Sequence, residues 1–425
     1  MGPHELAVGV GVAELELPDP VRMVGYAART EPSTGTHDPL TARALDLTDA
    51  VLVVLDVCGL TAATCRRVAE QVRPDDPGAV HLLTTHTHAG PECTPGRLGG
   101  CRPEVEQALV EAAVTACRRA AAARVPCTLH RGSARGAGVA RNRRHPDREV
   151  DPPVDVLRCT DADGRVRAVL VGYACHPVVL DASNRQLSAD FVHGLRTEVE
   201  EALPGAVAVF ATGCAGDLND GHPAEASYTT EPDPARGFAA AEEIGRRLGR
   251  LAVAAPTRPL SSPVVTVRRG EVELELQQLE DAAVSADVER WRRRARQAPA
   301  GERALLASWI DWAEHRVPAD RYTVPVALLG LGDLSLALLP GEPFWRTAEE
   351  LTAALPGDVV VLGYADDCPG YLPTREEYQH GGYEVADAHR YYGMPAPFAP
   401  GSAERLVASV VSLAASPTWL GTAPP

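Results

Sequence analysis

Two histidines, His86 and His88, stand two residues apart at the end of a short apolar run and just before a Gly-Pro pair. The run, residues 80–83, is typical of a buried strand, and the Gly-Pro pair ends regular structure. In an extended chain, residues i and i+2 project to the same face, so we expect both imidazoles to enter one space. The end of a strand is also where a rigid scaffold commonly presents functional side chains. The alternative is that one or both are ordinary histidines with satisfied hydrogen bonds.

Three more predicted strand ends carry a polar side chain beside Gly or Pro: His176, the pair Asp217 and Asn219, and Glu342. Two neutral imidazoles and one carboxylate form a ligand set for catalytic zinc, which keeps one position open for water or substrate. Spacing alone does not bring together residues so far apart in the chain. For Glu342 there is a second interpretation, as the cap of a helix starting near Pro343, where a carboxylate is favoured.

The elements that must position these residues alternate between strand and helix patterns, which predicts an α/β fold with a mixed β-sheet flanked by helices. Alternating or short apolar runs predict strands at residues 6–15, 41–47, 50–57, 80–83, 154–160, 165–173, 206–212, 324–339 (two strands) and 358–363. Helical spacing with start signals predicts helices at residues 60–72, 103–123, 189–203, 238–254 and 402–414. Residues 279–317 predict a helical insertion, expected to be the least functional part of the chain.

Composition limits the classes of function. The 425 residues carry a formal net charge of -16, which argues against nucleic acid and anionic membrane surfaces as partners. No apolar run approaches the ~20 residues of a membrane span, so no integral membrane association is expected. No secretory signal is apparent, and ten scattered cysteines without a CxxC pair suggest reduced thiols. We therefore expect a cytoplasmic protein that forms a single domain over residues 1–425.

Beyond these patterns, a series of segments resembles the motifs of the neutral/alkaline non-lysosomal ceramidase family. In chain order they read GYAART, GTHDPLTARAL, HTHAGP, ARNRRHP, CHP, LSADF, FATGCAGDLN, LLPGEPF and YLPTREEYQHGGYE. They follow the family's order over residues 6–385. The chain resembles compact members that consist of the N-terminal catalytic domain, without the family's C-terminal immunoglobulin-like domain.

The resemblance implies a zinc ion bound by four side chains: His86, His176, Glu342 and Tyr371. It also implies that His88 faces the substrate carbonyl, with Arg143 and Tyr383 as nearby donors. The alternatives are that the two tyrosines are packing aromatics and that Arg143, in a run of arginines, lies on a solvated face.

One position departs from the family's pattern. Where the family carries a serine implicated in catalysis, this chain reads Gly216-Asp217-Leu218-Asn219. An amide side chain is not a nucleophile, so no covalent acyl-enzyme forms at this position. We expect Asp217 and Asn219 to bind the substrate and shape the pocket.

These observations predict a zinc-dependent hydrolase that cleaves an amide bond of a small or amphipathic N-acyl substrate with metal-activated water. Whether that substrate is ceramide is left open, as is the oligomeric state. A zinc-dependent esterase or lactonase shares the mechanism and is the first alternative. A non-catalytic binding protein of the same fold is the second.

Overall fold

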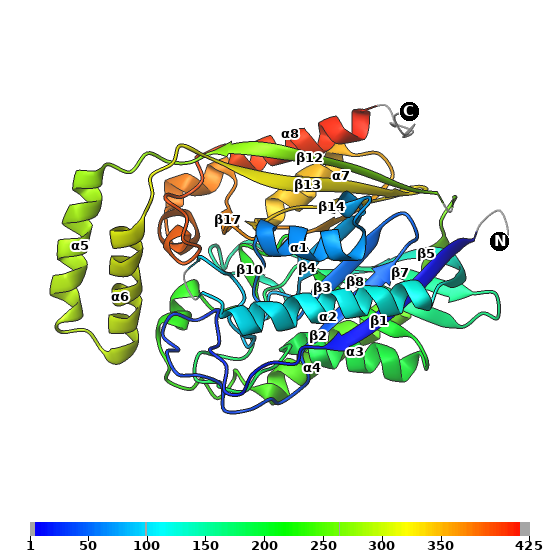
Figure 1. The fold of residues 1–425 in the computed structure, drawn as a ribbon, viewed down its shortest axis with the longest axis horizontal. Coiled ribbons are helices and arrows are strands. Elements are labelled where there is room, and N and C mark those ends of the chain that lie inside the picture. The colour runs from blue at the N-terminus through cyan, green and yellow to red at the C-terminus, as the bar shows by residue number, and fades with distance from the viewer. Residues whose placement is uncertain (1–4, 98–99, 263, 417–425) are drawn as a thin grey trace.

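The larger of two β-sheets forms the centre of the molecule. The structure, a computed structural model, describes residues 5–97, 100–262 and 264–416 (Figure 1). The strands of this sheet are β1 (Leu6–Glu14), β2 (Thr41–Asp46), β3 (Val51–Leu55), β4 (Val80–Thr84), β5 (Val125–Ala134), β7 (Val154–Asp161), β8 (Val166–Tyr173), β9 (Val207–Thr212) and β11 (Thr257–Pro259). Among the described residues they run in the order β4-β3-β2-β1-β5-β7-β8-β9, with β11 paired to β5. The pairs β3–β4 and β8–β9 are parallel and the other pairs are antiparallel.

A smaller sheet packs face to face on the larger one. Its strands are β12 (Val265–Glu275), β13 (Arg321–Leu331), β14 (Leu334–Leu338) and β16 (Asp358–Leu362), in that order. Buried side chains of both sheets form one apolar cluster between them. Two short pairs complete the strands: β6 (Arg141–Asn142) with β10 (Leu218–Asn219), and β15 (Glu342–Pro343) with β17 (Tyr371–Leu372).

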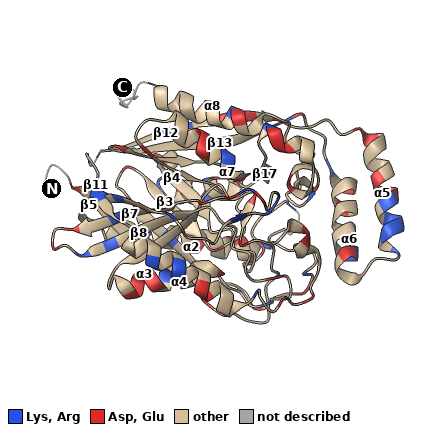
Figure 2. Ribbon diagram, turned by 180° about the vertical axis from the view of Figure 1, so that it is seen from behind, with Lys and Arg blue, Asp and Glu red and all other residues tan. Residues whose placement is uncertain are grey.

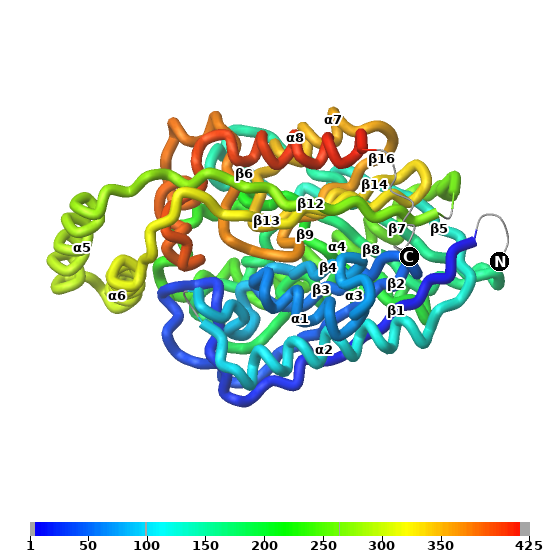
Figure 3. The backbone as a smooth tube through the Cα atoms, turned by 45° about the horizontal axis from the view of Figure 1, so that its top comes forward, coloured from blue at the N-terminus to red at the C-terminus, as the bar shows by residue number. Residues whose placement is uncertain are grey.

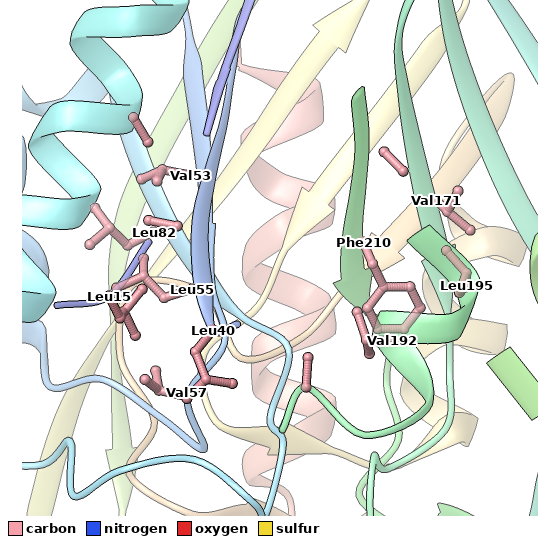
Figure 4. Packing of buried hydrophobic residues seen from close by; sticks show 14 of the residues in the cluster. Leu15, Leu40, Val53, Leu55, Val57, Leu82, Val171, Val192, Leu195 and Phe210 are labelled. Carbon is pink, nitrogen blue, oxygen red and sulfur yellow. The ribbon is translucent and has the colours of Figure 1, made fainter. Parts of the chain in front are cut away.

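Helices cover the outer faces of both sheets. The larger sheet packs against α1 (Ala62–Val72), α2 (Pro103–Ala122), α3 (Phe191–Ala202) and α4 (Phe238–Ala254), and Figure 4 shows part of this apolar core. The smaller sheet packs against α7 (Trp345–Ala354) and α8 (Ser402–Ala415). Gly9 and Gly11 explain how closely α2 approaches β1, because a Cβ atom at either position would collide with a carbonyl oxygen of α2. Of the described helices, none combines the length and apolar character needed to cross a membrane.

The helices α5 (Asp281–Ala295) and α6 (Ala300–His315) form a hairpin beside this body, between β12 and β13 in the chain (Figure 3). Arg390 anchors the hairpin: its guanidinium lies 4.9, 4.6 and 5.5 Å from the ring centres of Trp291, Trp309 and Trp312. The Trp312 indole also donates to the Met394 carbonyl at 2.8 Å. Basic residues gather on the outer helix α5 (Figure 2).

The predicted α/β class is confirmed, with two packed sheets in place of one. The strands β5, β11 and β12 are additions to the predicted elements, and α7 is the helix expected near Pro343. All ten cysteines are unpaired and eight are buried, as expected for reduced thiols. The single-domain organisation stays a prediction.

Topology brings the predicted site residues to one place. The edge strands β4 and β9 approach each other, and the Thr212 hydroxyl donates to the Thr85 carbonyl at 2.7 Å. Bridges between Leu83 and Ala365 and between Gly213 and Leu362 then join the two sheets at the same end. The carboxyl ends of β4, β8, β9, β14 and β16 therefore surround one space.

Candidate metal centre

Three of the predicted ligands meet at the centre of this space. The Nε2 atoms of His86 and His176 lie 3.2 and 2.8 Å from Oε2 of Glu342. All three side chains are fully buried, and their ligand atoms lie within 4.8 Å of one another. His86 and Glu342, which are 256 positions apart in the sequence, thus belong to one compact cluster of donor atoms.

The second nitrogen of each imidazole fixes its tautomer. Nδ1 of His86 is hydrogen-bonded to the Cys58 carbonyl, and Nδ1 of His176 to the Ala215 carbonyl at 2.6 Å. Since a carbonyl only accepts, both Nδ1 atoms donate, so in a neutral ring the Nε2 lone pair points at the carboxylate of Glu342. Three acceptors facing one another repel unless a cation or proton lies between them. The donor set therefore fits a divalent metal, with imidazoles oriented by backbone carbonyls as in many zinc sites.

The pKa shifts of Glu342 and His176 favour the protonation states in which these side chains bind a metal. Burial opposes ionisation of Glu342, but His86 and His176 hold its pKa well below the usual range. Burial, followed by the charge of Arg143, lowers the pKa of His176 to about 4. At neutral pH the centre thus contains an ionised carboxylate and a neutral His176 imidazole, which is the protonation state that metal binding requires.

Tyr371, the fourth predicted ligand, lies at the edge of the cluster. Its hydroxyl is 3.5 Å from Nε2 of His176 and accepts a hydrogen bond from Nη2 of Arg143 at 3.0 Å. The parallel pairing of β15 with β17 sets Tyr371 directly beside Glu342. Burial raises the pKa of the phenol well above its usual range, while Arg143 acts in the opposite direction. Ligation by Tyr371 therefore requires the metal to assist its deprotonation, and it stays a prediction.

Cys58 forms a second group with His86 and His88 that is compact enough to hold a metal. Burial raises the pKa of the Cys58 thiol well above its usual range. Because the thiolate is the form that binds metals, this group is the poorer candidate.

His88 lies beside the cluster, with its Nε2 atom 3.3 Å from Nε2 of His86. The two imidazoles do enter one space, but the alternation of an extended strand is not the reason. β4 ends at Thr84, and His86 has the left-handed backbone angle φ 64°, a strained conformation for a residue with a side chain. Burial, followed by the nearby imidazoles, lowers the pKa of His88 well below its usual range, so its ring is neutral.

Gly25 closes the other side of His88. It has φ 103°, and a Cβ atom built there would lie 2.5 Å from Cγ of His88. The absence of a side chain at Gly25 therefore lets the imidazole occupy its observed position.

Arg143 and Tyr383, the two predicted donors, also reach this region. Arg143 is buried and donates from Nε to Glu384 at 2.8 Å, so the alternative of a solvated face is wrong. Tyr383 begins a single π-helical turn, Tyr383–Asp387, and its ring centre lies 5.7 Å from that of Tyr371. Turns of this kind are frequent at functional sites.

Asp217 and Asn219 are buried, and their side chains form hydrogen bonds with nearby loop residues. Asp217 accepts from the Trp345 amide and the Asn142 side chain, each at 2.8 Å. The Asn219 side chain donates to the His222 carbonyl and accepts from the Gly221 amide, also at 2.8 Å each. These bonds hold loops in place, and the substrate-binding role of the two residues stays a prediction.

Glu342 does not cap a helix. It lies in β15, whereas α7 starts after Phe344, and Asp217 accepts the hydrogen bond from the first amide of that helix. The alternative interpretation of Glu342 is therefore wrong, and its carboxylate is free to serve the cluster.

A cavity of about 180 Å³ opens from His88, and we call it the site cavity. Its walls are rich in tyrosine. They include Tyr26 and Arg29 of the GYAART segment, and three tyrosines that sequence patterns did not single out: Tyr228, Tyr391 and Tyr392. Tyr392 also donates to Oε1 of Glu342. The adjacent tyrosines of the aromatic-rich segment after β16 were the signal for this wall.

The α5–α6 hairpin contributes to the same cavity. Ala304 and Ser308 of α6 line it. The expectation that residues 279–317 are the least functional part of the chain stays a prediction, although α6 supplies part of the cavity wall.

Known proteins share this architecture and its sequence pattern. The family model "Neutral/alkaline non-lysosomal ceramidase, N-terminal" matches residues 7–220. The crystal structure of neutral ceramidase from Pseudomonas aeruginosa aligns over 96% of this chain and 74% of its own, with 21% identity and a TM-score of 0.74. A structure described as a ceramidase complexed with C2 aligns over 99% and 77%, with 20% identity and a TM-score of 0.73. No curated protein sequence matches at a significant level. On the family match, the shared fold and the motifs around its buried centre, the chain belongs to the neutral/alkaline non-lysosomal ceramidase family.

Proposed function

We propose that the chain is a zinc-dependent hydrolase that cleaves the amide bond of a small or amphipathic N-acyl substrate. The observation that carries this proposal is the convergence of the Nε2 atoms of His86 and His176 on the carboxylate of Glu342, next to a cavity. Membership of a family of ceramidases supports amide hydrolysis as the reaction class. The ten unpaired cysteines support a reducing, cytoplasmic compartment.

His86, His176 and Glu342 would hold the ion, with Tyr371 as the fourth ligand. A zinc ion there would supply Lewis acidity, which polarises a carbonyl and lowers the pKa of a coordinated water from ~15.7 towards ~7. The cluster is buried and reached from the site cavity, so bulk water has little access and electrostatic effects are strong.

His88 is placed to act on the amide. It lines the site cavity beside the cluster, and its neutral ring carries one N–H that can donate to a developing oxyanion. Tyr383 lines the same cavity and can protonate the leaving amine. Arg143 lies one step back: it bonds Tyr371 and Glu384 and so fixes the aromatic wall.

The test is a zinc titration of metal-free protein with three substrate sets: a short-chain ceramide, a panel of N-acyl amides and the matching esters. We expect amide turnover to rise with zinc up to one equivalent per chain and to vanish with a chelator. Amide turnover that persists after the metal has been removed contradicts the proposal. Hydrolysis of the esters alone identifies an esterase or lactonase, and full zinc occupancy without turnover identifies a binding protein.

A further inference from the structure

The charge of the site cavity is opposite to that of the whole chain. The chain has a formal net charge of -16, yet the charged side chains among the described residues that line the cavity are Arg22 and Arg29, with no carboxylate. A small enclosed space with one sign of charge selects ligands of the other sign.

Arg29 is a buried cation without an anionic partner. It is 5% exposed, and it donates to the carbonyl oxygens of Asn184 at 3.1 Å, Val24 at 2.7 Å and His88 at 2.5 Å. Its Nε atom is buried and has no hydrogen-bond partner in the part of the chain that the structure describes. Burial lowers the pKa of Arg29 to about 10, so the group is still charged at neutral pH.

Asp181 is the carboxylate whose charge acts on Arg29, but it forms no ion pair with it. Asp181 acts on Arg29 only through space, because its oxygens accept from Ser183 at 2.5 Å and from the Asp233 amide at 2.7 Å. Arg143, the other buried arginine of the region, does have a carboxylate partner, Glu384 at 2.8 Å. A buried charge without a counter-charge is costly, so one on the cavity wall is typical of a site for an anion.

Arg22 extends the positive wall towards solvent. Its side chain is exposed, lines the cavity, and has no hydrogen bond or ion pair within the described ranges. An entering anion would therefore meet Arg22 at the rim before it reaches the field of Arg29.

The volume of the cavity limits the rest of the ligand. At about 180 Å³ it is smaller than the roughly 300 Å³ at the lower end of pockets for drug-sized molecules. Tyrosine rings around it offer flat apolar contact and hydroxyl groups, which suits a short acyl or aromatic group better than a long alkyl chain.

We propose that the substrate is a small N-acyl amide that carries a carboxylate, as in the N-acyl amino acids, and that Arg22 and Arg29 select this charge. This inference rests on the proposed amide hydrolysis. In the reaction, water adds across the amide: a C–O bond forms, the C–N bond breaks and a proton passes to the nitrogen. The products are a short carboxylic acid and a free amino acid, and no oxidant or second substrate is consumed.

The test compares an N-butanoyl amino acid with its carboxamide, which has nearly the same size but no charge. Both binding, by calorimetry, and kcat/KM are measured with the zinc-loaded full chain. A charge-assisted hydrogen bond stabilises a complex enough to change affinity about tenfold or more, so we expect at least a tenfold preference for the carboxylate. Equal binding and equal kcat/KM overturn the inference but leave amide hydrolysis standing.

A zinc ion also attracts carboxylates, so variants must separate the two effects. In Arg22→Gln, with zinc content unchanged, we expect the ratio of carboxylate to carboxamide, in both affinity and kcat/KM, to fall at least fivefold. Arg118→Gln is the matched control, because it removes an exposed arginine of α2 that is outside the cavity. If Arg22→Gln keeps the full preference, the metal selects the charge and the inference fails. If no amide is hydrolysed, the proposed function fails, and calorimetry still decides whether the cavity prefers the anion.

Discussion

Substitution of Gly25 by alanine tests the role of His88 without changing His88 itself. The new Cβ atom would lie 2.5 Å from Cγ of His88, whereas ordinary contacts begin at 3.4 Å, so the imidazole must retreat by about 0.9 Å. A misplacement of ~1 Å in a catalytic arrangement costs about 10²-fold in rate. We therefore expect kcat for the best amide to fall by about 10²-fold, with zinc content unchanged, because the three atoms nearest to the new methyl group all belong to His88.

The assay is steady-state kinetics on zinc-loaded protein, with metal analysis of the same samples. Gly35→Ala is the control: Gly35 also has a positive φ, 132°, but no atom lies within 4 Å of the added Cβ. It carries the same kind of backbone strain, of the order of 1–2 kcal/mol, without the contact. If Gly25→Ala and Gly35→Ala lower kcat equally, strain explains the loss and the placement of His88 does not. If Gly25→Ala loses zinc, His88 or its neighbour is held by the metal and the separation of roles is wrong.

Three further predictions follow from the ligands, the replaced serine and the buried acids. His86→Ala should lose zinc and activity together, whereas His88→Ala should keep the metal and lose turnover by ~10²–10⁴-fold; metal analysis showing full occupancy in His86→Ala would refute the ligand assignment. Asn219→Ser should not raise the rate markedly and should show no burst of product or mass-shifted protein, since its side chain bonds local backbone; a covalent adduct seen by mass spectrometry would contradict this. Burial raises the pKa of Asp190 to about 7 from its ordinary 3.8, so the folded state keeps the proton over a range in which the unfolded chain has lost it. Its contribution to stability is therefore present below about pH 4 and falls as the pH rises to about 7, and Asp190→Asn should make the free energy of unfolding less dependent on pH in that window; an unchanged pH slope in urea titrations would show that Asp190 is ionised in the folded state.

The members of the candidate metal cluster could be picked out one by one, because each of them ends a strand or follows a turn with a strong local signal. His176 and Glu342 stand beside Gly or Pro after an apolar run, and His86 precedes the pair Gly90-Pro91 in the same loop. Parallel pairing brings such strand ends together. Local pattern could not show that they meet, since contact depends on the approach of β4 to β9 and on the packing of two sheets. The resemblance to a known family supplied that step.

The cavity wall was not predictable in the same way. Arg29 and Tyr392 lie in irregular segments, and nothing periodic in those segments points to a common space. The strands β5 and β12 escaped prediction because charged residues and a proline interrupt their alternation, as in the VTVRRGEVELE of β12. The imidazoles of His86 and His88 share one space as expected, but the expected reason was wrong, since a left-handed residue replaced the extended one. Backbone strain of this kind depends on tertiary packing and leaves no mark in the local sequence.

The α5–α6 hairpin places part of the cavity wall on a different segment from the one that holds the candidate ligands. The candidate ligands His86, His176 and Glu342 lie at or just after the ends of strands, whereas Ala304 and Ser308 of α6, which line the cavity, belong to a segment held to the body through Arg390 and Trp312. Changes along α6 can therefore remodel what the cavity accepts without disturbing the strands that hold the ligands. This modular arrangement makes the hairpin the natural segment to exchange when a new specificity is sought.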